Sequence, residues 1–427
     1  MYALIRTNLM NKKSLIIIGA GASGLMAAKE LSGRFHITIL EASLRIGGRI
    51  NSIQIQDDII EAGPEFIHGH LPLTFKLLKR SKIKAVPVEG KFYRKKNDRF
   101  IEQDDMLDGW NELLKKMGAV KEDVTMHQFL EKFYPGNSNQ LFRKMVYGYT
   151  EGFDIADPVK VSVQSLYKEW ISEEGTNYKI PNGYLSLMEY LKEEANSTIL
   201  TGKKIKKVRW EKGHVTAFTT GDEAFHADKL LITVPVSILQ NQSAENSIQF
   251  DPEINEHINA AQNIEFGTVI KTVIKFKDSF WQKDAAFFFS DEEYFPTWWT
   301  QFPGSPIITG WTGGPKASIL SGENKDFILL KALRSLSIIF NKNIEDLQGM
   351  IIYAEVFNWQ KEPFSFGAYS YNSIYSETAK KVLNTPIANT VFFAGEALYS
   401  GKYPGTVEAA LHSGKSVAKQ IKKAMSS

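Results

Sequence analysis

The chain has 427 residues, with 51 lysines and arginines, 48 aspartates and glutamates, and no cysteine. A formal net charge of +3 is too small to indicate nucleic-acid binding, and the lack of cysteine excludes disulfides, thiolate chemistry and zinc–cysteine sites. The length predicts about two domains. No apolar run is long enough to span a bilayer, and residues 1–13 lack a signal-peptide core, so we expect a cytoplasmic protein without a membrane partner.

The most informative stretch lies near the N-terminus. An apolar strand over residues 15–18 runs into the loop GAGASG, then into a helix, and a second strand over 36–40 ends on Glu41. This spacing matches the dinucleotide-binding fingerprint in its required context, with the glycines giving a tight turn and close approach to a pyrophosphate. Glu41 can accept hydrogen bonds from a ribose hydroxyl pair. The loop residues expected to contact the cofactor are Gly19, Gly21, Ala22, Ser23 and Gly24.

The residues after Glu41 read EASLRIGGR, in which a glycine pair is flanked by two arginines. Such a loop suits tight folding over a cofactor's phosphates and ring. The run resembles the FAD motif of the flavin-containing amine oxidase superfamily, which includes monoamine oxidases, polyamine oxidases and flavin-dependent histone demethylases. The resemblance implies FAD contacts from Ala42, Arg45, Gly47, Gly48 and Arg49.

Residues 71–180 read as helical and irregular, with helical periodicity over 74–80, 106–117 and 139–147. Such a block suits an inserted substrate domain. The lysine-rich pieces 91–96 and 203–207 are short and predict solvated faces or turns.

From residue 180 the pattern changes to a turn, a helix over 185–194, and short strands over 199–200, 205–210, 214–219 and 230–234. Further strands are expected within 251–281, 287–299 and 307–311, and a last buried strand over 390–394 precedes a helix from about Thr406. With the resemblance, this order predicts an α/β fold: a Rossmann-like FAD-binding domain of the two-dinucleotide-binding type with an interleaved α+β substrate domain. The expected FAD-binding segments are 1–70, 185–240 and 380–427, and the substrate-binding segments are 71–184 and 241–379.

Further blocks extend the resemblance over nearly the whole chain. Residues 61–69 look like the family segment that lines the flavin ring, with His68 near the substrate entrance, and Ile205 matches a position whose backbone meets adenine. The segment FGTVIK ends on Lys271, the position of the family lysine that reaches flavin N5 through a water. From the residues alone, a lysine here must pair or snorkel, or it faces outward. The other cofactor contacts assigned on the resemblance are Gly63, Pro64, Glu65, Phe66 and Trp359.

Near the C-terminus, residues 366–370 and 391–408 resemble the family's terminal flavin segments. The resemblance implies that Tyr369 and Tyr403 form the two walls of an aromatic cage, although ordinary core packing is the simpler role for either. Ala368 stands where some monoamine oxidases carry a flavin-linked cysteine, so we expect FAD to bind non-covalently. The remaining FAD contacts expected here are Gly395, Glu396, Thr406 and Val407.

These features predict an FAD-dependent amine oxidase that converts a primary or secondary amine to an imine, with O2 reduced to H2O2. The expected partners are a small amine and O2, with Lys271, Tyr369 and Tyr403 as catalytic residues and no metal. An L-amino-acid oxidase or related flavin oxidoreductase is an alternative, and a flavin-binding protein without turnover is another. Three tryptophans either line a tunnel or pack the core: Trp298, Trp299 and Trp311.

Overall fold

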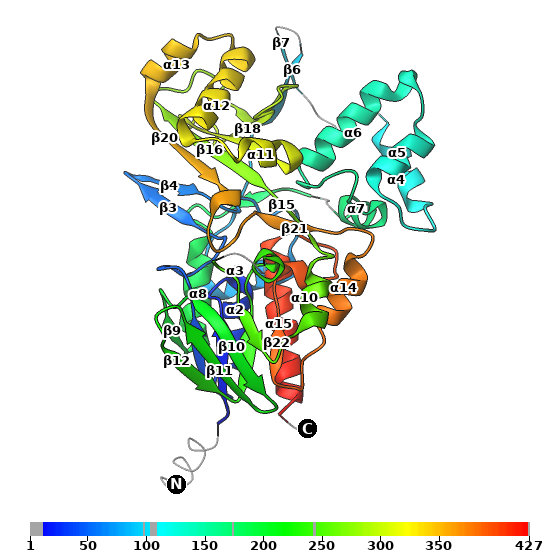
Figure 1. Ribbon diagram of the computed structural model, residues 1–427. Coiled ribbons are helices and arrows are strands. Elements are labelled where there is room, and N and C mark those ends of the chain that lie inside the picture. Colours follow the sequence, from blue (N-terminus) through cyan, green and yellow to red (C-terminus); the bar gives the residue numbers. More distant parts are fainter. Residues whose placement is uncertain (1–11, 97–98, 103–108, 173–174, 242–244, 426–427) are drawn as a thin grey trace. The chain divides into compact units, whose positions relative to one another are not determined.

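The computed structural model describes residues 12–96, 99–102, 109–172, 175–241 and 245–425 (Figure 1). The chain forms two compact units, each assembled from separate segments. The first unit comprises residues 1–85, 180–265 and 363–427, and the second comprises 86–179 and 266–362.

The first unit contains two sheets with their flanking helices. Its elements are β1 (Ser14–Ile18), α2 (Ala22–Leu31), β2 (His36–Leu40), β3 (Ser52–Ile55), β4 (Asp58–Glu61), α3 (Pro72–Ser81), α8 (Leu185–Ala195), β9 (Thr198–Leu200), β10 (Ile205–Glu211), β11 (His214–Thr219), β12 (Ala224–Ala227), β13 (Lys229–Ile232), α9 (Val236–Gln240), β14 (Gln249–Asp251), α10 (Asn255–Ala261), β21 (Tyr369–Tyr371), α14 (Ser376–Leu383), β22 (Val391–Phe393), η3 (Glu396–Leu398) and α15 (Val407–Lys423).

A five-stranded parallel sheet forms the centre of this unit, in the order β22-β13-β1-β2-β9. Strands β1 and β13 are almost entirely buried apolar runs, as expected for parallel strands covered on both faces. Helices α2 and α15 lie against each other in Figure 1, and a Cβ on Gly414 would lie only 2.2 Å from the Ser23 carbonyl oxygen. The glycine therefore permits the close approach of the two helices.

A smaller four-stranded sheet follows the order β12-β11-β10-β14. Strands β10, β11 and β12 are antiparallel neighbours, and β14 joins β10 in parallel. The predicted lysine-rich stretch 203–207 runs into β10, where its side chains pair with nearby acids, for example Lys207 with Asp251 at 3.1 Å. This stretch is a solvated strand face rather than a turn.

The second unit contains the sheet with the most strands among the described residues. Its elements are β5 (Val86–Pro87), β6 (Lys91–Lys96), β7 (Arg99–Glu102), α4 (Trp110–Gly118), α5 (Met126–Phe133), η1 (Asn137–Asn139), α6 (Gln140–Gly152), α7 (Val163–Trp170), β8 (Tyr178–Lys179), β16 (Val269–Phe276), β17 (Ala285–Phe289), β18 (Thr297–Thr300), β19 (Ile307–Gly313), α11 (Gly314–Leu320), α12 (Lys325–Phe340), α13 (Ile344–Met350), β20 (Ile351–Asn358) and η2 (Trp359–Lys361). Strand β15 (Glu265–Gly267) contains the boundary between the units.

Seven strands form this sheet in the order β20-β16-β19-β18-β17-β6-β7. One of its faces packs against α11, α12 and α13 through a core that includes Ile270, Phe288 and Trp298, all fully buried. Trp298 also donates from Nε1 to the Phe295 carbonyl (2.9 Å) and to Ser335 Oγ (3.1 Å). Of the two roles considered for this tryptophan, the structure supports core packing.

For residues 71–180, the structure decides between the two alternatives for one lysine-rich piece and confirms the described part of one predicted helix. Residues 91–96 are not a turn but strand β6, which pairs in parallel with β17. Its charged side chains are accommodated because it lies near the sheet edge, where Lys91 meets Glu102 at 2.9 Å. The helix expected over 106–117 is α4, and its predicted start at residues 106–108 lies outside the described residues.

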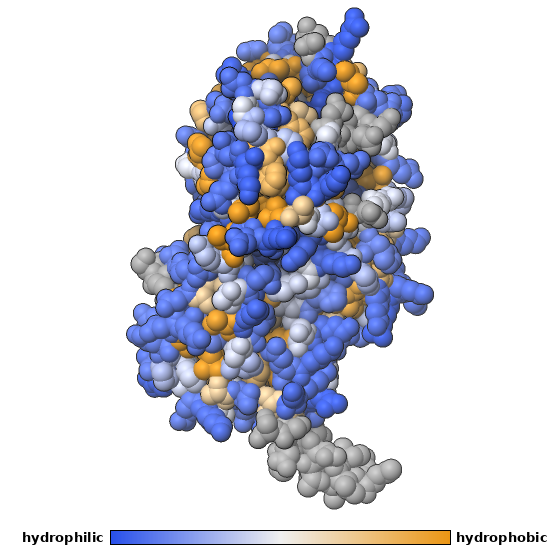
Figure 2. All heavy atoms as spheres, turned by 90° about the vertical axis from the view of Figure 1, so that its right-hand side faces the viewer, coloured by the Kyte–Doolittle hydropathy of each residue, from blue (hydrophilic) through white to orange (hydrophobic). Residues whose placement is uncertain are grey.

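None of the helices in the described ranges is both long and apolar enough to cross a membrane. Figure 2 shows one face of the molecule, on which hydrophilic side chains are interspersed with small groups of apolar ones.

Candidate active site

The glycine-rich loop after β1 is shaped by packing against the strand end at Thr233. Gly19 has φ +106°, and a Cβ there would lie 2.7 Å from Thr233 Oγ1. A Cβ on Gly24 would lie 2.1 Å from the Gly19 carbonyl oxygen, so helix α2 could not approach the loop as it does. These two glycines are required by the protein itself. The sequence did not single out Thr233, which follows β13 and contacts this loop. Its hydroxyl donates to the Ile18 carbonyl at 2.8 Å.

Gly21 differs, because no described atom would clash with a Cβ at this position. It is the N-cap of α2 with φ −80°, and the nearest described atom to an added Cβ is the Gly47 carbonyl oxygen at 3.9 Å. A Cβ on Gly395, in an extended conformation, would meet no described atom within 4 Å. Both positions leave backbone facing open space, as the surface beside a closely held ligand must.

Polar groups around this space are available to a ligand. The hydroxyl of Ser23 is buried and has no hydrogen-bond partner among the described residues. No side chain caps the N-terminus of α2, so its first N–H groups and the positive end of its dipole are available to an anion. A buried hydroxyl, uncapped helix N–H groups and an open glycine together fit the phosphates of a dinucleotide.

Glu41 lies at the end of β2 with its side chain buried beside the same loop. Its carboxylate accepts from the N–H of Ala20 (2.7 Å) and from the N–H of Ser43 (2.8 Å), one on each oxygen. Burial raises the pKa of the Glu41 carboxyl above its ordinary value, while these N–H donors and Arg45 oppose the rise. The N–H of Ala42 also interacts favourably with this carboxylate, and a carboxylate has about four acceptor sites, so the residue can still accept from a ribose hydroxyl.

The segment from Arg45 to Ile50 folds back onto the glycine-rich loop. The N–H of Gly47 donates to the Ala20 carbonyl at 2.9 Å, and Gly47 has φ +97°. Arg45 donates from Nη1 to the carbonyls of Ile46 (3.2 Å) and Ile50 (3.0 Å), so this arginine holds its own loop in shape.

Arg49 reaches the C-terminal part of the first unit. Its Nη1 lies 2.7 Å from Oε1 of Glu396 and donates to the Ala368 carbonyl at 2.8 Å. Ser370 completes the cluster, because its hydroxyl donates to Oε2 of Glu396 at 2.6 Å. Glu396 is only 4% exposed, so loss of its cationic partner would leave a costly buried charge. The structure therefore joins the predicted residues Arg49 and Glu396, and it adds Ser370, which the sequence did not single out.

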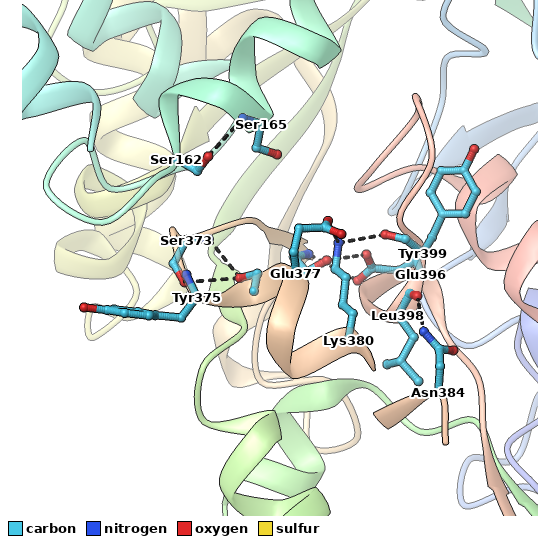
Figure 3. Close-up of polar contacts among 12 residues, drawn as sticks. Ser162, Ser165, Ser373, Tyr375, Glu377, Lys380, Asn384, Glu396, Leu398 and Tyr399 are labelled. Atoms are coloured by element: carbon cyan, nitrogen blue, oxygen red, sulfur yellow. Dashed lines mark hydrogen bonds and ion pairs between the residues drawn. The ribbon is translucent and has the colours of Figure 1, made fainter. Parts of the chain in front are cut away.

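A second contact fixes the chain just after Glu396 (Figure 3). Lys380 lies on α14 with its side chain buried, and Asn384 follows one helical turn later as the C-cap of this helix. Lys380 donates from Nζ to the Tyr399 carbonyl at 2.7 Å, and Asn384 donates from Nδ2 to the Leu398 carbonyl at 2.9 Å. These two bonds fix the consecutive carbonyls of Leu398 and Tyr399, and so they fix the position where the segment leading to Tyr403 begins.

The two predicted cage tyrosines lie on neighbouring segments. A Cβ on Gly405 would lie 2.9 Å from Cδ2 of Tyr369, so the Tyr369 ring rests against the loop that carries Tyr403. Thr406 is the N-cap of α15, where its Oγ1 accepts from the N–H of Ala409 at 3.1 Å and donates to the Tyr403 carbonyl at 2.7 Å. Helix α15 thus begins at Val407, one residue after the predicted start at about Thr406, and the Tyr403 carbonyl is bonded to its N-cap.

Glu408, in the first turn of α15, has a role that the sequence did not suggest. It is fully buried, and its carboxylate accepts from the N–H groups of Leu73 (2.8 Å) and Thr74 (2.7 Å). Helix α3 has no side-chain cap of its own, so Glu408 supplies one from the other end of the chain. The sequence signal available for this capping role was an acidic residue on the apolar face of an amphipathic helix, next to Ala409.

The other predicted residues of the first unit lie at the start of a strand and in loops. Ile205 is buried at the start of β10, and His68 is half-buried with its ring 5.9 Å from that of Phe66. The remaining candidates lie in the two loops that follow β2 and β4: Ala42, Gly48, Gly63, Pro64 and Glu65.

Lys271 and Trp359 belong to the second unit. Lys271, on β16, is 1% exposed, and its Nζ lies 5.4 Å from the centroid of the Trp299 ring. Trp311 lies opposite Lys271 on β19, with its Nε1 donating to the Gly152 carbonyl at 2.7 Å. Trp359 is buried in η2. Trp299 and Trp311 therefore share the sheet face that carries Lys271, whereas Trp298 lies on the other face.

A family model described as flavin containing amine oxidoreductase matches residues 22–422. The chain belongs to this family. Family membership implies a flavin cofactor, and the glycine-rich loop, Ser23 and Glu41 provide groups that fit one.

Two curated relatives illustrate the sequence similarity. Protein FLOWERING LOCUS D of Arabidopsis thaliana is 26% identical over 95% of this chain and 54% of its own length. Lysine-specific histone demethylase 1B of Mus musculus is 25% identical over 96% of this chain and 53% of its own length. The chain thus spans about half the length of these relatives.

Solved structures support the fold. A putrescine oxidase bound to putrescine has a TM-score of 0.80 and 17% identity, with 96% of this chain and 99% of that chain covered. Cyclohexylamine oxidase from Brevibacterium oxydans IH-35A has a TM-score of 0.80 and 18% identity, covering 97% of this chain and 100% of that chain. The predicted α/β fold, with a Rossmann-like flavin-binding architecture, is confirmed.

Proposed function

We propose that the protein is an FAD-dependent amine oxidase that converts a primary or secondary amine to an imine, with reduction of O2 to H2O2. The observation that carries this proposal is Lys271, a lysine almost fully buried beside Trp299 at the position where the family places its flavin lysine. FAD, when bound, accepts the hydride from the carbon next to the amine nitrogen and passes the electrons to O2.

Different residues of the first unit are proposed to bind different parts of the cofactor. In this proposal, Gly21, Ser23 and the N-terminus of α2 bind the pyrophosphate, and Glu41 accepts from the ribose hydroxyls. Arg49, held by Glu396, supplies a positive charge beside the ribityl chain and phosphates. The first N–H groups of α15 favour negative charge on the flavin pyrimidine.

The substrate must lose a proton before it reacts. A primary alkylamine has a pKa of about 10.4, so its neutral form at pH 7.4 costs roughly 4 kcal/mol. Burial in an apolar slot lowers an amine pKa by up to about 3–5 units, which is sufficient without a dedicated base. Tyr369 and Tyr403 are the proposed walls of this slot, where their rings attract the incoming ammonium by about 1–2 kcal/mol and orient its lone pair.

Demethylation of a methylated lysine is a second candidate, because the curated relatives include proteins named lysine-specific histone demethylases. The chemistry is the same, since an N-methyl group is also a carbon next to an amine nitrogen. The two candidates differ only in the substrate that the chain admits.

One screen tests both candidates. Purified holoprotein is assayed for peroxide with monoamines, diamines, polyamines, L-amino acids and a dimethyl-lysine peptide. Peroxide formation with simple amines supports the proposal. Turnover of zwitterionic amino acids alone would contradict it, as would a lack of turnover with every amine.

We also propose that FAD is bound without a covalent link, because the chain has no cysteine and Ala368 follows Gly367 at the expected attachment position. Acid precipitation should release all of the yellow colour into the supernatant. Colour retained in the washed pellet would show attachment through another residue.

A further inference from the structure

We infer that a row of aromatic side chains beside Lys271 binds the apolar tail of the substrate, and that the preferred substrate carries a single ammonium group. This inference rests on the proposed function, which places Lys271 at the reacting centre. The row is made of Trp311, Trp299, Phe287, Phe289 and Phe92, and we call it the aromatic row.

Strand register places these side chains on one face of the seven-stranded sheet. Residues directly opposite each other on paired strands point to the same face. Lys271 is opposite Trp311, which is opposite Thr297. Two residues along β18, Trp299 is opposite Phe287, which is opposite Phe92. The face therefore runs without a break from β16 to β6.

The rings are in contact along the whole row. The Trp311 and Trp299 centroids are 5.9 Å apart, and Trp299 lies 6.1 Å from Phe287. Phe287 continues to Phe92 at 4.9 Å and to Phe289 at 6.0 Å. Lys271 stands over Trp299 at the inner end. With adjacent strands about 4.8 Å apart, the four steps from β16 to β6 span roughly 19 Å.

The two faces of the sheet differ in exposure. The opposite face is sealed by its own helices, and Phe288 and Trp298 there are fully buried. On the aromatic row, Phe287, Phe289 and Trp311 are only half-buried, and Phe92 is 39% exposed. Exposure thus rises from buried Trp299 through half-buried Phe287 to Phe92, as it would on a binding surface for an elongated apolar group.

The charged side chains on this face determine which kind of substrate tail the aromatic row can bind. On β17, β18 and β19, the positions that share this face hold aromatic, threonine and isoleucine side chains and no carboxylate. The outer end carries a cation, Arg94, whose guanidinium lies 5.7 Å from the Phe289 ring and pairs with the exposed Asp291. Glu355 shares the face but lies on β20, on the other side of Lys271. A second ammonium on the row would lose water without gaining a carboxylate, so diamines and polyamines bind poorly.

The test compares linear alkylamines of four to eight carbons with α,ω-diamines of the same lengths on the holoprotein. We expect kcat/KM to rise roughly three- to fourfold per added methylene in the alkylamine series. We expect each diamine to fall below its matched alkylamine by about 100-fold or more, because its second charge is desolvated unpaired. Equal or higher kcat/KM for the diamines would overturn the inference while leaving the proposed function intact. A lack of turnover with both series would instead contradict the proposed function, and the inference with it.

Variants locate the effect on the row. Phe287→Glu and Phe92→Glu each introduce a carboxylate at the row, and Phe133→Glu is the matched control, since Phe133 is 36% exposed on α5 outside the sheet. We expect the two row variants to shift the diamine-to-alkylamine ratio of kcat/KM toward the diamine by at least about tenfold, mainly through KM. If Phe287→Glu does not fold, Phe92→Glu at the exposed end carries the test. An unchanged ratio in folded row variants, or an equal shift in the control, would refute the inference.

Discussion

The first unit offers its expected ligand both backbone groups and side chains such as Ser23 and Glu41, whereas the second offers a row of side chains on one sheet face. In the first unit, Gly21 and Gly395 leave open space, and α2 presents uncapped N–H groups. In the second, Lys271 and the aromatic row project from strands of one sheet. A backbone site tolerates little change at its glycines, while a side-chain surface can be retuned residue by residue.

The largest effect should come from the backbone site, where two glycines have different reasons to be glycine. Gly24→Ala places a Cβ 2.1 Å from the Gly19 carbonyl oxygen, so we expect the apoprotein to lose about 1–3 kcal/mol or more of unfolding free energy. Gly21→Ser meets no described atom closer than 3.9 Å and supplies a favoured N-cap, so the apoprotein should be unchanged or slightly stabilised.

Both variants should weaken FAD binding by at least about 100-fold, which is roughly 2.7 kcal/mol. Gly24→Ala would do so by distorting the loop, and Gly21→Ser by placing a side chain in the space left for the expected phosphates. Urea unfolding of the apoproteins and fluorescence titration with FAD measure the two quantities separately. Equal destabilisation of the two apoproteins would show that Gly21 serves packing rather than the ligand.

Lys271→Met should affect rate without affecting cofactor binding. We expect FAD to be retained and either flavin reduction or reoxidation to slow by at least about tenfold, a barrier change near 1.4 kcal/mol. Lys275→Met, on the same strand and the same face, is the control and should keep both rates within about twofold, a change below roughly 0.5 kcal/mol. Stopped-flow absorbance measures both half-reactions. Wild-type rates in Lys271→Met would remove this lysine from the mechanism.

Glu408→Gln tests the contact by which α15 caps the N-terminus of α3. The amide keeps one acceptor where the carboxylate serves the N–H groups of Leu73 and Thr74, so a buried donor is left unpaired. We expect a loss of about 2 kcal/mol in unfolding free energy. His412→Gln, which changes a 40% exposed partner of the same carboxylate, should cost less than about 0.5 kcal/mol. Similar losses from the two variants would contradict the capping role.

The smallest effect is a pH dependence. Burial places the pKa of Glu41 above its ordinary value of 4.5 in the apoprotein, and ribose hydroxyls that donate to it favour the ionised form. FAD affinity should therefore be full at neutral pH and fall as the pH drops through this raised pKa, by up to about tenfold per pH unit. Titrations with FAD between pH 4.5 and 8 should show this slope in the wild type and a flatter one in Glu41→Gln.

The sequence predicted the first unit better than the second for a physical reason. Strand, glycine loop, helix and acid follow one another within a few dozen residues, so β1, α2 and β2 appear where the local pattern placed them. The start of α15 was predicted for the same reason, because its signal also lies within a short segment. The contacts of Glu408 with Leu73 and of Lys380 with Tyr399 were not predicted, because they depend on which segments the fold brings together.

The second unit depends on pairings between distant segments. Strand β6 is basic, and its sequence alone is compatible with a solvated face or a turn until β17 is placed beside it. The role of Trp298 and Trp299 could not be separated by sequence, since adjacent residues on a strand differ only in the face they occupy. Register assigns Trp298 to the core and Trp299 to the face of Lys271.

The central claim is that an amine reduces the bound flavin and O2 reoxidises it. The most direct measurement mixes holoprotein with an excess of a linear alkylamine in the absence of air, followed by return of O2. We expect complete loss of the flavin absorbance at about 450 nm in the absence of air. After O2 returns, H2O2 and aldehyde should form in equal amounts as the imine hydrolyses, and the absorbance should recover once the amine is consumed. A flavin that stays oxidised with every amine, although dithionite reduces it, would contradict the account.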